Sequence, residues 1–89
     1  MTEVAFSSSF KRAFKKRIAG QSAAEERFWQ RVEWFASNPH DPRLRTHKLS
    51  GKLKEQWSFT VEYDVRVLFY FSTPTKVVFT DIGTHDEVY

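Results

Sequence analysis

The chain has 89 residues, no cysteine, and 14 lysines and arginines against 11 aspartates and glutamates, which gives a formal net charge of +3. The lack of cysteine excludes disulfides, thiolate catalysis and cysteine-bound metals, and no apolar run reaches the roughly 18 residues that a membrane span needs. We therefore expect residues 1–89 to form a single domain in the reducing cytoplasm, without a secretory signal.

Positive charge is concentrated in two blocks of the sequence. Residues 1–20 sum to +4 and residues 38–57 to +3, whereas residues 58–89 sum to −3. Such an uneven distribution favours a polyanionic partner. The alternative is that these lysines and arginines only solvate exposed helix faces.

The first twenty residues predict a short strand followed by a helix. Residues 3–6 have a strand-like pattern, and one of the serines at positions 7–9 can cap the helix by accepting from an unpaired N–H of its first turn. Apolar residues then recur at every fourth position on one helix face, at Phe10, Phe14 and Ile18. Gly20 is expected to end the helix.

A second helix is predicted from Ser22 to the pair Asn38-Pro39, because the residue before a proline is disfavoured in the α region. Ser22 and Glu25 have the spacing of a capping box, in which the two side chains satisfy backbone N–H groups of the first turn. The buried side of this helix is predicted to carry Phe28, Val32 and Phe35. Residues 40–51 are expected to form a basic loop.

From Gln56 the pattern changes to a period of two over residues 57–62, which is typical of a half-buried strand, and residues 65–71 form a longer, almost continuously apolar run. We expect strands at residues 57–62, 65–71 and 76–82, joined by turns at 63–64 and 73–75, and a short polar tail from residue 84. The order predicts an α+β fold, in which an N-terminal strand and a two-helix hairpin pack on one face of a mostly antiparallel sheet. The other face of the sheet would then be free to carry function.

Two histidines and one aspartate are the candidate proton-transfer groups. His47 precedes a basic segment, Asp64 lies at the turn between two predicted strands, and His85 follows the last strand. Imidazole gains and loses a proton near neutral pH, which suits general acid–base catalysis. A lone loop histidine is more often idle, and aspartate is common in turns. No short-range spacing of metal ligands is present, although a zinc site assembled from these three residues stays open.

Cationic and aromatic side chains accompany these groups. Arg66 interrupts an otherwise apolar strand, so it must reach solvent or be paired, and its planar fork suits a phosphate. Lys52 and Lys54 could neutralise further phosphate charge. Tyr89 could stack on a base or be an unattached end. The pattern is consistent with RNA binding or cleavage.

Three segments resemble the RelE/ParE superfamily of toxins from type II toxin–antitoxin systems. They are His47-Lys-Leu-Ser-Gly-Lys-Leu-Lys54, Asp64-Val-Arg-Val-Leu-Phe-Tyr70 and Ile82-Gly-Thr-His-Asp-Glu-Val-Tyr89. The first histidine, the aspartate at the turn, and the Gly-Thr-His with an aromatic residue four positions later resemble the YafQ-type branch. The order of strands and helices matches as well, so the resemblance covers nearly the whole chain.

The resemblance implies a RelE-like fold and a metal-independent endoribonuclease without cofactors (an mRNA interferase). Such a toxin cuts translated mRNA on the 70S ribosome, inhibits translation, and is held inactive by a cognate antitoxin. By position, the resemblance implies acid–base roles for His47, Asp64 and His85 and a nucleotide-orienting role for Tyr89. It leaves open whether His47 or Asp64 is the general base. Phosphate contacts would fall to Lys52, Lys54 and Arg66.

One departure from the YafQ-type pattern concerns Thr60, which stands four residues before Asp64 where that branch has a further histidine. A hydroxyl cannot replace imidazole in proton transfer, so either the remaining groups suffice or activity is weaker. Two alternatives follow: a ParE-like toxin that inhibits DNA gyrase, or a non-catalytic module that binds RNA or protein. The pair His47 and His85 argues against the first alternative, and Thr60 keeps the second one open.

Overall fold

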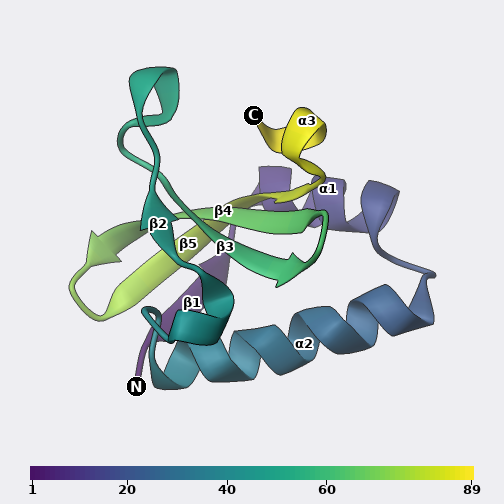
Figure 1. The fold of residues 1–89 in the computed structure, drawn as a ribbon, viewed down its shortest axis with the longest axis horizontal. Coiled ribbons are helices and arrows are strands. Elements are labelled where there is room, and N and C mark those ends of the chain that lie inside the picture. Colours follow the sequence, from purple (N-terminus) through teal and green to yellow (C-terminus); the bar gives the residue numbers. More distant parts are fainter.

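The computed structural model describes all residues from Met1 to Tyr89 and contains one five-stranded sheet (Figure 1). Its strands are β1 (Glu3–Phe6), β2 (His47–Lys48), β3 (Trp57–Glu62), β4 (Val65–Thr73) and β5 (Lys76–Gly83). Its helices are α1 (Ser8–Arg17), α2 (Ser22–Ser37) and α3 (His85–Val88), with 3₁₀ turns at Pro42–Leu44 and Gly51–Leu53. The strand order is β1-β5-β4-β3-β2, and only β1 and β5 run parallel. The predicted α+β fold is confirmed.

Helix α1 begins and ends close to the predicted positions. The Ser7 hydroxyl accepts the N–H of Phe10 at 3.0 Å, so it caps the first turn. Gly20 follows the helix with a φ of 89°, in the left-handed region that glycine adopts without strain. Phe10 and Ile18 are buried, so the apolar face of the helix points into the core as its periodicity predicts.

Helix α2 starts at the expected residue, but the predicted capping box at its start is wrong. Gln21 is the capping residue, and no side chain bonds to the first turn. Ser22 is already helical, which places its hydroxyl one position too late to cap. Instead the Gln21 carbonyl accepts the N–H of Glu25 at 2.9 Å. The helix ends at Ser37, and Phe28 and Phe35 are buried on its inner face.

The core between the helices and the sheet is built mostly of phenylalanine. The Phe79 ring on β5 lies 5.5 Å from the ring centre of Phe10, 5.5 Å from that of Phe35 and 5.5 Å from that of Phe59. One ring therefore contacts α1, α2 and β3 together. Aromatic pairs at such separations stabilise beyond the area that they bury.

The second face of the sheet is only partly free. In Figure 1, α3 and the loop around Gly51–Leu53 lie on the side of the sheet opposite to α2. Leu68 and Val88 are buried there, outside the main core cluster. The predicted loop of residues 40–51 also contains β2, which extends the sheet beyond β3. The longest helix, α2, has 16 residues, so none of the helices could cross a lipid bilayer.

Candidate functional site

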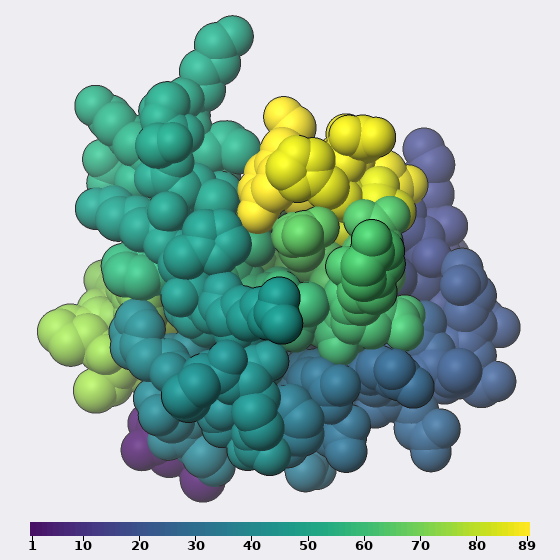
Figure 2. Space-filling model, in the orientation of Figure 1, coloured from purple at the N-terminus to yellow at the C-terminus, as the bar shows by residue number.

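A cavity of about 630 Å³ opens at one end of the sheet. Of the candidate residues from the sequence, it is lined by His47, Asp64, Arg66 and His85, and also by Thr60. Figure 2 shows this side of the molecule, where the teal residues of the forties, the green residues of the mid-sixties and the yellow C-terminal residues meet. Groups that are distant along the chain therefore share one solvent-open pocket.

His47 is held by the backbone at the start of β2. It pairs with Ser58 of β3, and its Nδ1 lies 3.0 Å from the carbonyl oxygen of Arg45. Because a carbonyl oxygen only accepts, this contact assigns the proton to Nδ1. The Nε2 atom of the neutral ring is then left as a proton acceptor.

Asp64 and Arg66 lie on either side of the first residue of β4. Arg66 Nη1 is 3.8 Å from Asp64 Oδ1, so the two form an ion pair at the mouth of the turn. The Asp64 side chain is more than half exposed, whereas that of Arg66 is 26% exposed. Arg66 pairs with Thr60 across the β3–β4 ladder, so a threonine stands beside the guanidinium of this site.

His85 is the first residue of α3, so the prediction of a short polar tail from residue 84 is wrong. Thr84 and Glu87 form a capping box: the Thr84 hydroxyl accepts the N–H of Glu87, and Glu87 Oε1 accepts the N–H of Thr84 at 2.7 Å. The hydrogen bond from the Thr84 N–H holds the pKa of Glu87 below its ordinary value, with smaller contributions from the nearby cations Arg17 and Lys16.

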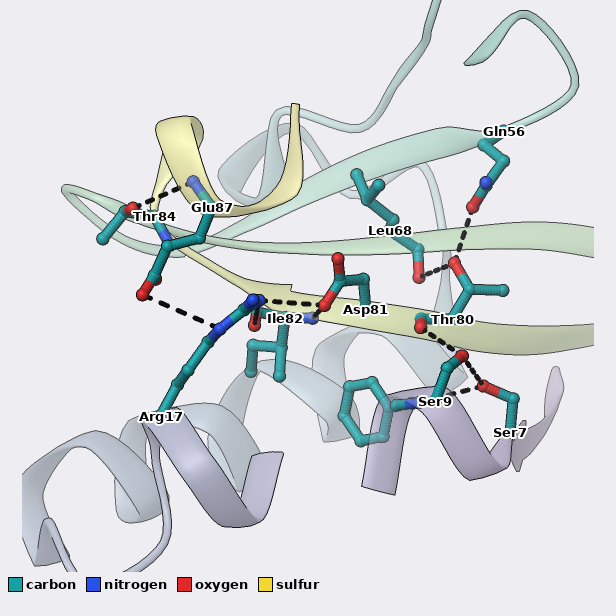
Figure 3. A network of polar contacts seen from close by, with 11 residues as sticks. Ser7, Ser9, Arg17, Gln56, Leu68, Thr80, Asp81, Ile82, Thr84 and Glu87 are labelled. Carbon is teal, nitrogen blue, oxygen red and sulfur yellow. Dashed lines mark hydrogen bonds and ion pairs between the residues drawn. The ribbon is translucent and has the colours of Figure 1, made fainter. Parts of the chain in front are cut away.

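Arg17 of α1 ties this short helix to the sheet (Figure 3). Its Nη1 donates to Asp81 Oδ1 at 3.0 Å and to the Ile82 carbonyl at 2.9 Å, and its Nε lies 3.7 Å from Glu87 Oε2. A Cβ atom at Gly83 would lie 2.7 Å from Glu87 Oε1 and 2.9 Å from Arg17 Nη1, so a larger residue there would push these two side chains out of their present contacts. The orientation of His85 thus depends on an arginine almost seventy residues earlier in the chain.

The remaining candidate residues lie outside this cavity. The Tyr89 ring packs edge-on against the His85 imidazole, with 4.4 Å between ring centres, as residues one helical turn apart do. Tyr89 and Lys52 line a neighbouring cavity of about 310 Å³. Lys54 is exposed after the 3₁₀ turn Gly51–Leu53 and lines neither cavity.

Residues 2–89 match the protein family described as "Bacterial toxin of type II toxin-antitoxin system, YafQ". This chain belongs to that family. Among curated protein sequences, none matches it.

Solved structures share the fold of this YafQ-family toxin at low sequence identity. YafQ from Escherichia coli BL21(DE3) superposes with a TM-score of 0.78 at 17% identity, covering 100% of this chain and 99% of that one. A metal-bound toxin from Helicobacter pylori gives 0.79 at 19% identity, with both chains covered completely. A YoeB/ParE toxin from Agrobacterium tumefaciens gives 0.77 at 10% identity over 94% of this chain and 99% of its own.

Three further arginines line the cavity of the YafQ-family toxin and were not recognised from the sequence as site residues. They are Arg31, Arg43 and Arg45. With Arg66 they make four guanidinium groups against two carboxylates, so the cavity carries excess positive charge even with both histidines neutral. In the sequence, Arg31 has the pattern of an exposed helix residue. For Arg43 and Arg45, the only signal is the basic composition of residues 38–57.

Carboxylates and histidines do not gather into a metal site in this family member. No group of three or more histidine, aspartate and glutamate side chains is placed to hold an ion. His47, Asp64 and His85 therefore share the cavity without the geometry of a zinc site.

Proposed function

We propose that this YafQ-family toxin is an endoribonuclease that cuts translated mRNA on the ribosome. The observation that carries the proposal is the cavity itself, which places two imidazoles, a carboxylate and an excess of guanidinium groups around one solvent-open space. An RNA backbone fits such a site, since its phosphates need cations and its 2′-hydroxyl needs a base.

The reaction needs two proton transfers. The 2′-oxygen attacks the adjacent phosphorus, the bond from phosphorus to the 5′-oxygen breaks, and a 2′,3′-cyclic phosphate and a free 5′-hydroxyl result. His47 Nε2 takes the proton of the 2′-hydroxyl, because Nδ1 is committed to the Arg45 carbonyl. His85 gives a proton to the departing 5′-oxygen. Each such transfer contributes typically about 10²–10⁴-fold.

Charge stabilisation falls to Arg66 in this mechanism. Its guanidinium borders the cavity and is paired with Asp64 only at 3.8 Å, so it can turn N–H groups to the non-bridging oxygens of the phosphate. In this mechanism His47 is the general base, and Asp64 has the role of orienting Arg66 through their ion pair. Lys52 and Lys54 would contact the strand beyond the reacting phosphate, and Tyr89 supports the His85 ring from behind.

The ribosome supplies positioning that this open site lacks. Well-oriented reactions gain about 7–11 kcal/mol from positioning alone, which suits a site with few catalytic groups. Structural relatives include the DinJ–YafQ complex of E. coli and a YoeB–YefM complex of Staphylococcus aureus. By analogy, we propose that a cognate antitoxin binds this chain, and that an acidic segment of the antitoxin covers the cavity.

The test is to map mRNA 5′ ends by primer extension after brief expression of the protein. Wild type is expected to produce new ends within translated regions, and His85→Ala is expected to produce none while folding normally. His40→Ala is the matched control, because His40 is exposed, lies outside the cavity and should leave cleavage unchanged. A folded His85→Ala protein that still cleaves, or a wild type that leaves mRNA intact, would refute the proposal.

A further inference from the structure

One tryptophan on α2 holds two of the arginines that line the cavity. The guanidinium carbon of Arg31 lies 4.2 Å from the ring centre of Trp34, and that of Arg43 lies 3.8 Å from it. Such contacts fix a cation over an aromatic face. Because both guanidinium carbons lie so close to the same ring centre, the distance between them cannot exceed the sum of these two distances. That sum is about the Debye length at physiological ionic strength, about 8 Å, so salt does not screen the two charges from each other completely.

Arg31 is also oriented by its own hydrogen bonds. Its Nε donates to the Val61 carbonyl at 3.0 Å, and Nη1 donates to Gln30. Burial lowers the pKa of Arg31, and the neighbouring cations Arg27 and Arg43 lower it further. A guanidinium stays protonated at neutral pH all the same, so the fold holds like charges together there. An anion bound at the cavity wall, within reach of both guanidinium groups, would relieve that repulsion.

Arg43 is positioned by Asp41, which accepts from Nε at 3.1 Å and from Nη2 at 2.8 Å. These bonds use one edge of the guanidinium and leave its other N–H groups free. Asp41 also caps the 3₁₀ turn Pro42–Leu44 by accepting the N–H of Arg43 at 2.9 Å. Both arginines thus have fixed planes and unused donors at the wall of the cavity.

We propose that Arg31 and Arg43, held by Trp34, form a second phosphate subsite that binds the RNA strand next to the reacting phosphate. The inference rests on the proposed function for the choice of RNA as the ligand. The subsite lies on the α2 side of the cavity. His85 lines the same cavity from α3, which lies on the other side of the sheet. The bound strand therefore runs across the cavity, from the tryptophan-held arginines toward His85.

The test measures binding of a short single-stranded RNA by fluorescence anisotropy over a range of salt concentrations. The RNA carries 2′-O-methyl groups, so it cannot undergo 2′-hydroxyl attack and its binding is measured whether or not the protein is a nuclease. Each phosphate contact contributes about 0.7 to the slope of log K against log salt for single strands. Arg31→Gln/Arg43→Gln is therefore expected to reduce the slope by roughly 1.4.

The matched control is Lys11→Gln/Lys15→Gln, which removes the same charge from the exposed face of α1 and should leave the slope unchanged. Asp41→Asn keeps an acceptor for the cap but frees Arg43, so it is expected to tighten binding, even if the double arginine variant does not fold. Equal slopes for the two double variants, or no change with Asp41→Asn, would overturn the subsite, as would wild-type protein that fails to bind at the lowest salt. If the double arginine variant reduces the slope but the wild type does not cleave mRNA in the primer-extension experiment, the subsite stands and the proposed nuclease activity is refuted.

Discussion

Ser58 is a buried polar residue whose hydroxyl has no partner in the fold. It is fully buried in β3, between His47 of β2 and Leu68 of β4, and its Oγ makes no hydrogen bond. A buried hydroxyl without a partner costs about 1–3 kcal/mol of stability, because its contacts with water are lost and not replaced. Because Ser58 pairs with His47, this unpaired hydroxyl lies on the strand next to a residue of the candidate site.

Replacing Ser58 by alanine is expected to raise the free energy of unfolding by about 1 kcal/mol, since the desolvated hydroxyl is removed and the side-chain volume is nearly kept. Urea denaturation monitored by tryptophan fluorescence measures the change. Ser37→Ala, at the exposed end of α2, is the control and should shift stability by only a few tenths of a kcal/mol. A clear loss of stability in Ser58→Ala would mean that the hydroxyl bonds to a buried water.

Helix α3 is too short to be stable by itself, since even helices of about 12 residues are marginal in water. The capping box and the Arg17 ion pairs hold it on the sheet. Glu87 takes part in both, because one carboxylate oxygen accepts from Thr84 and the other faces Arg17. The charge of a single carboxylate thus links α1 to the helix that carries His85.

Glu87→Gln is expected to keep the cap and lose the charge, because glutamine also serves in a capping box. The pKa of Glu87 is lowered in the folded state, so its contribution to stability is present above the ordinary value of 4.5 and is lost as pH falls through the lower folded value. The melting temperature of wild type should therefore exceed that of Glu87→Gln at pH 7, and the gap should close below pH 4.5.

Thermal melts of both proteins at several pH values measure this gap. Glu26→Gln, which removes an exposed carboxylate without an ion pair, is the control and should melt with the wild type. A gap that persists unchanged in acid would show that the charge of Glu87 does not hold α3.

At the scale of the whole molecule, the aromatic core joins the two long helices to the sheet. Phe79 contacts rings from both long helices and from β3, so its loss would loosen all of these elements at once. A phenylalanine in such a position buries a large apolar area and leaves a large cavity when it is truncated.

Phe79→Ala is expected to lower the free energy of unfolding by about 3–5 kcal/mol, much of the roughly 5–15 kcal/mol that small domains have. Phe79→Leu should cost less because it keeps most of the apolar volume. Denaturant titration measures both variants. Tyr63→Ala, at a side chain that is 96% exposed, should stay within about 0.5 kcal/mol of wild type. A mild effect of Phe79→Ala would mean that the surrounding rings collapse into the space.

Local patterns predicted most of the elements but not their arrangement. The apolar spacing of four in α1, the alternation over residues 57–62 and the apolar run over residues 65–71 predicted α1, β3 and β4, since each pattern depends only on nearby residues. The parallel pairing of β1 with β5 joins residues more than seventy positions apart, so no local pattern could reveal it. Helix α3 was missed because four residues show no periodicity, although Thr84 and Glu87 have the spacing of a cap.

The candidate site was predictable to a similar extent. His47, Asp64 and His85 were singled out through residue chemistry and a family resemblance, and the fold places them around one cavity. Arg31 depends on tertiary contacts with Trp34 and Val61, which a helix pattern cannot show. The roles of these residues, and the single-domain organisation, remain predictions.

The place of β5 in the sheet has a consequence for the newborn polypeptide. This strand is the last to be synthesised, yet it lies between β1 and β4, so β1 has no hydrogen-bonding neighbour until Lys76–Gly83 has emerged. Long-range pairings of this kind form late in folding. A copy synthesised only as far as the end of β4 would contain both long helices and the β3–β4 hairpin but neither β5 nor His85, so the cavity is complete only when nearly every residue is in place.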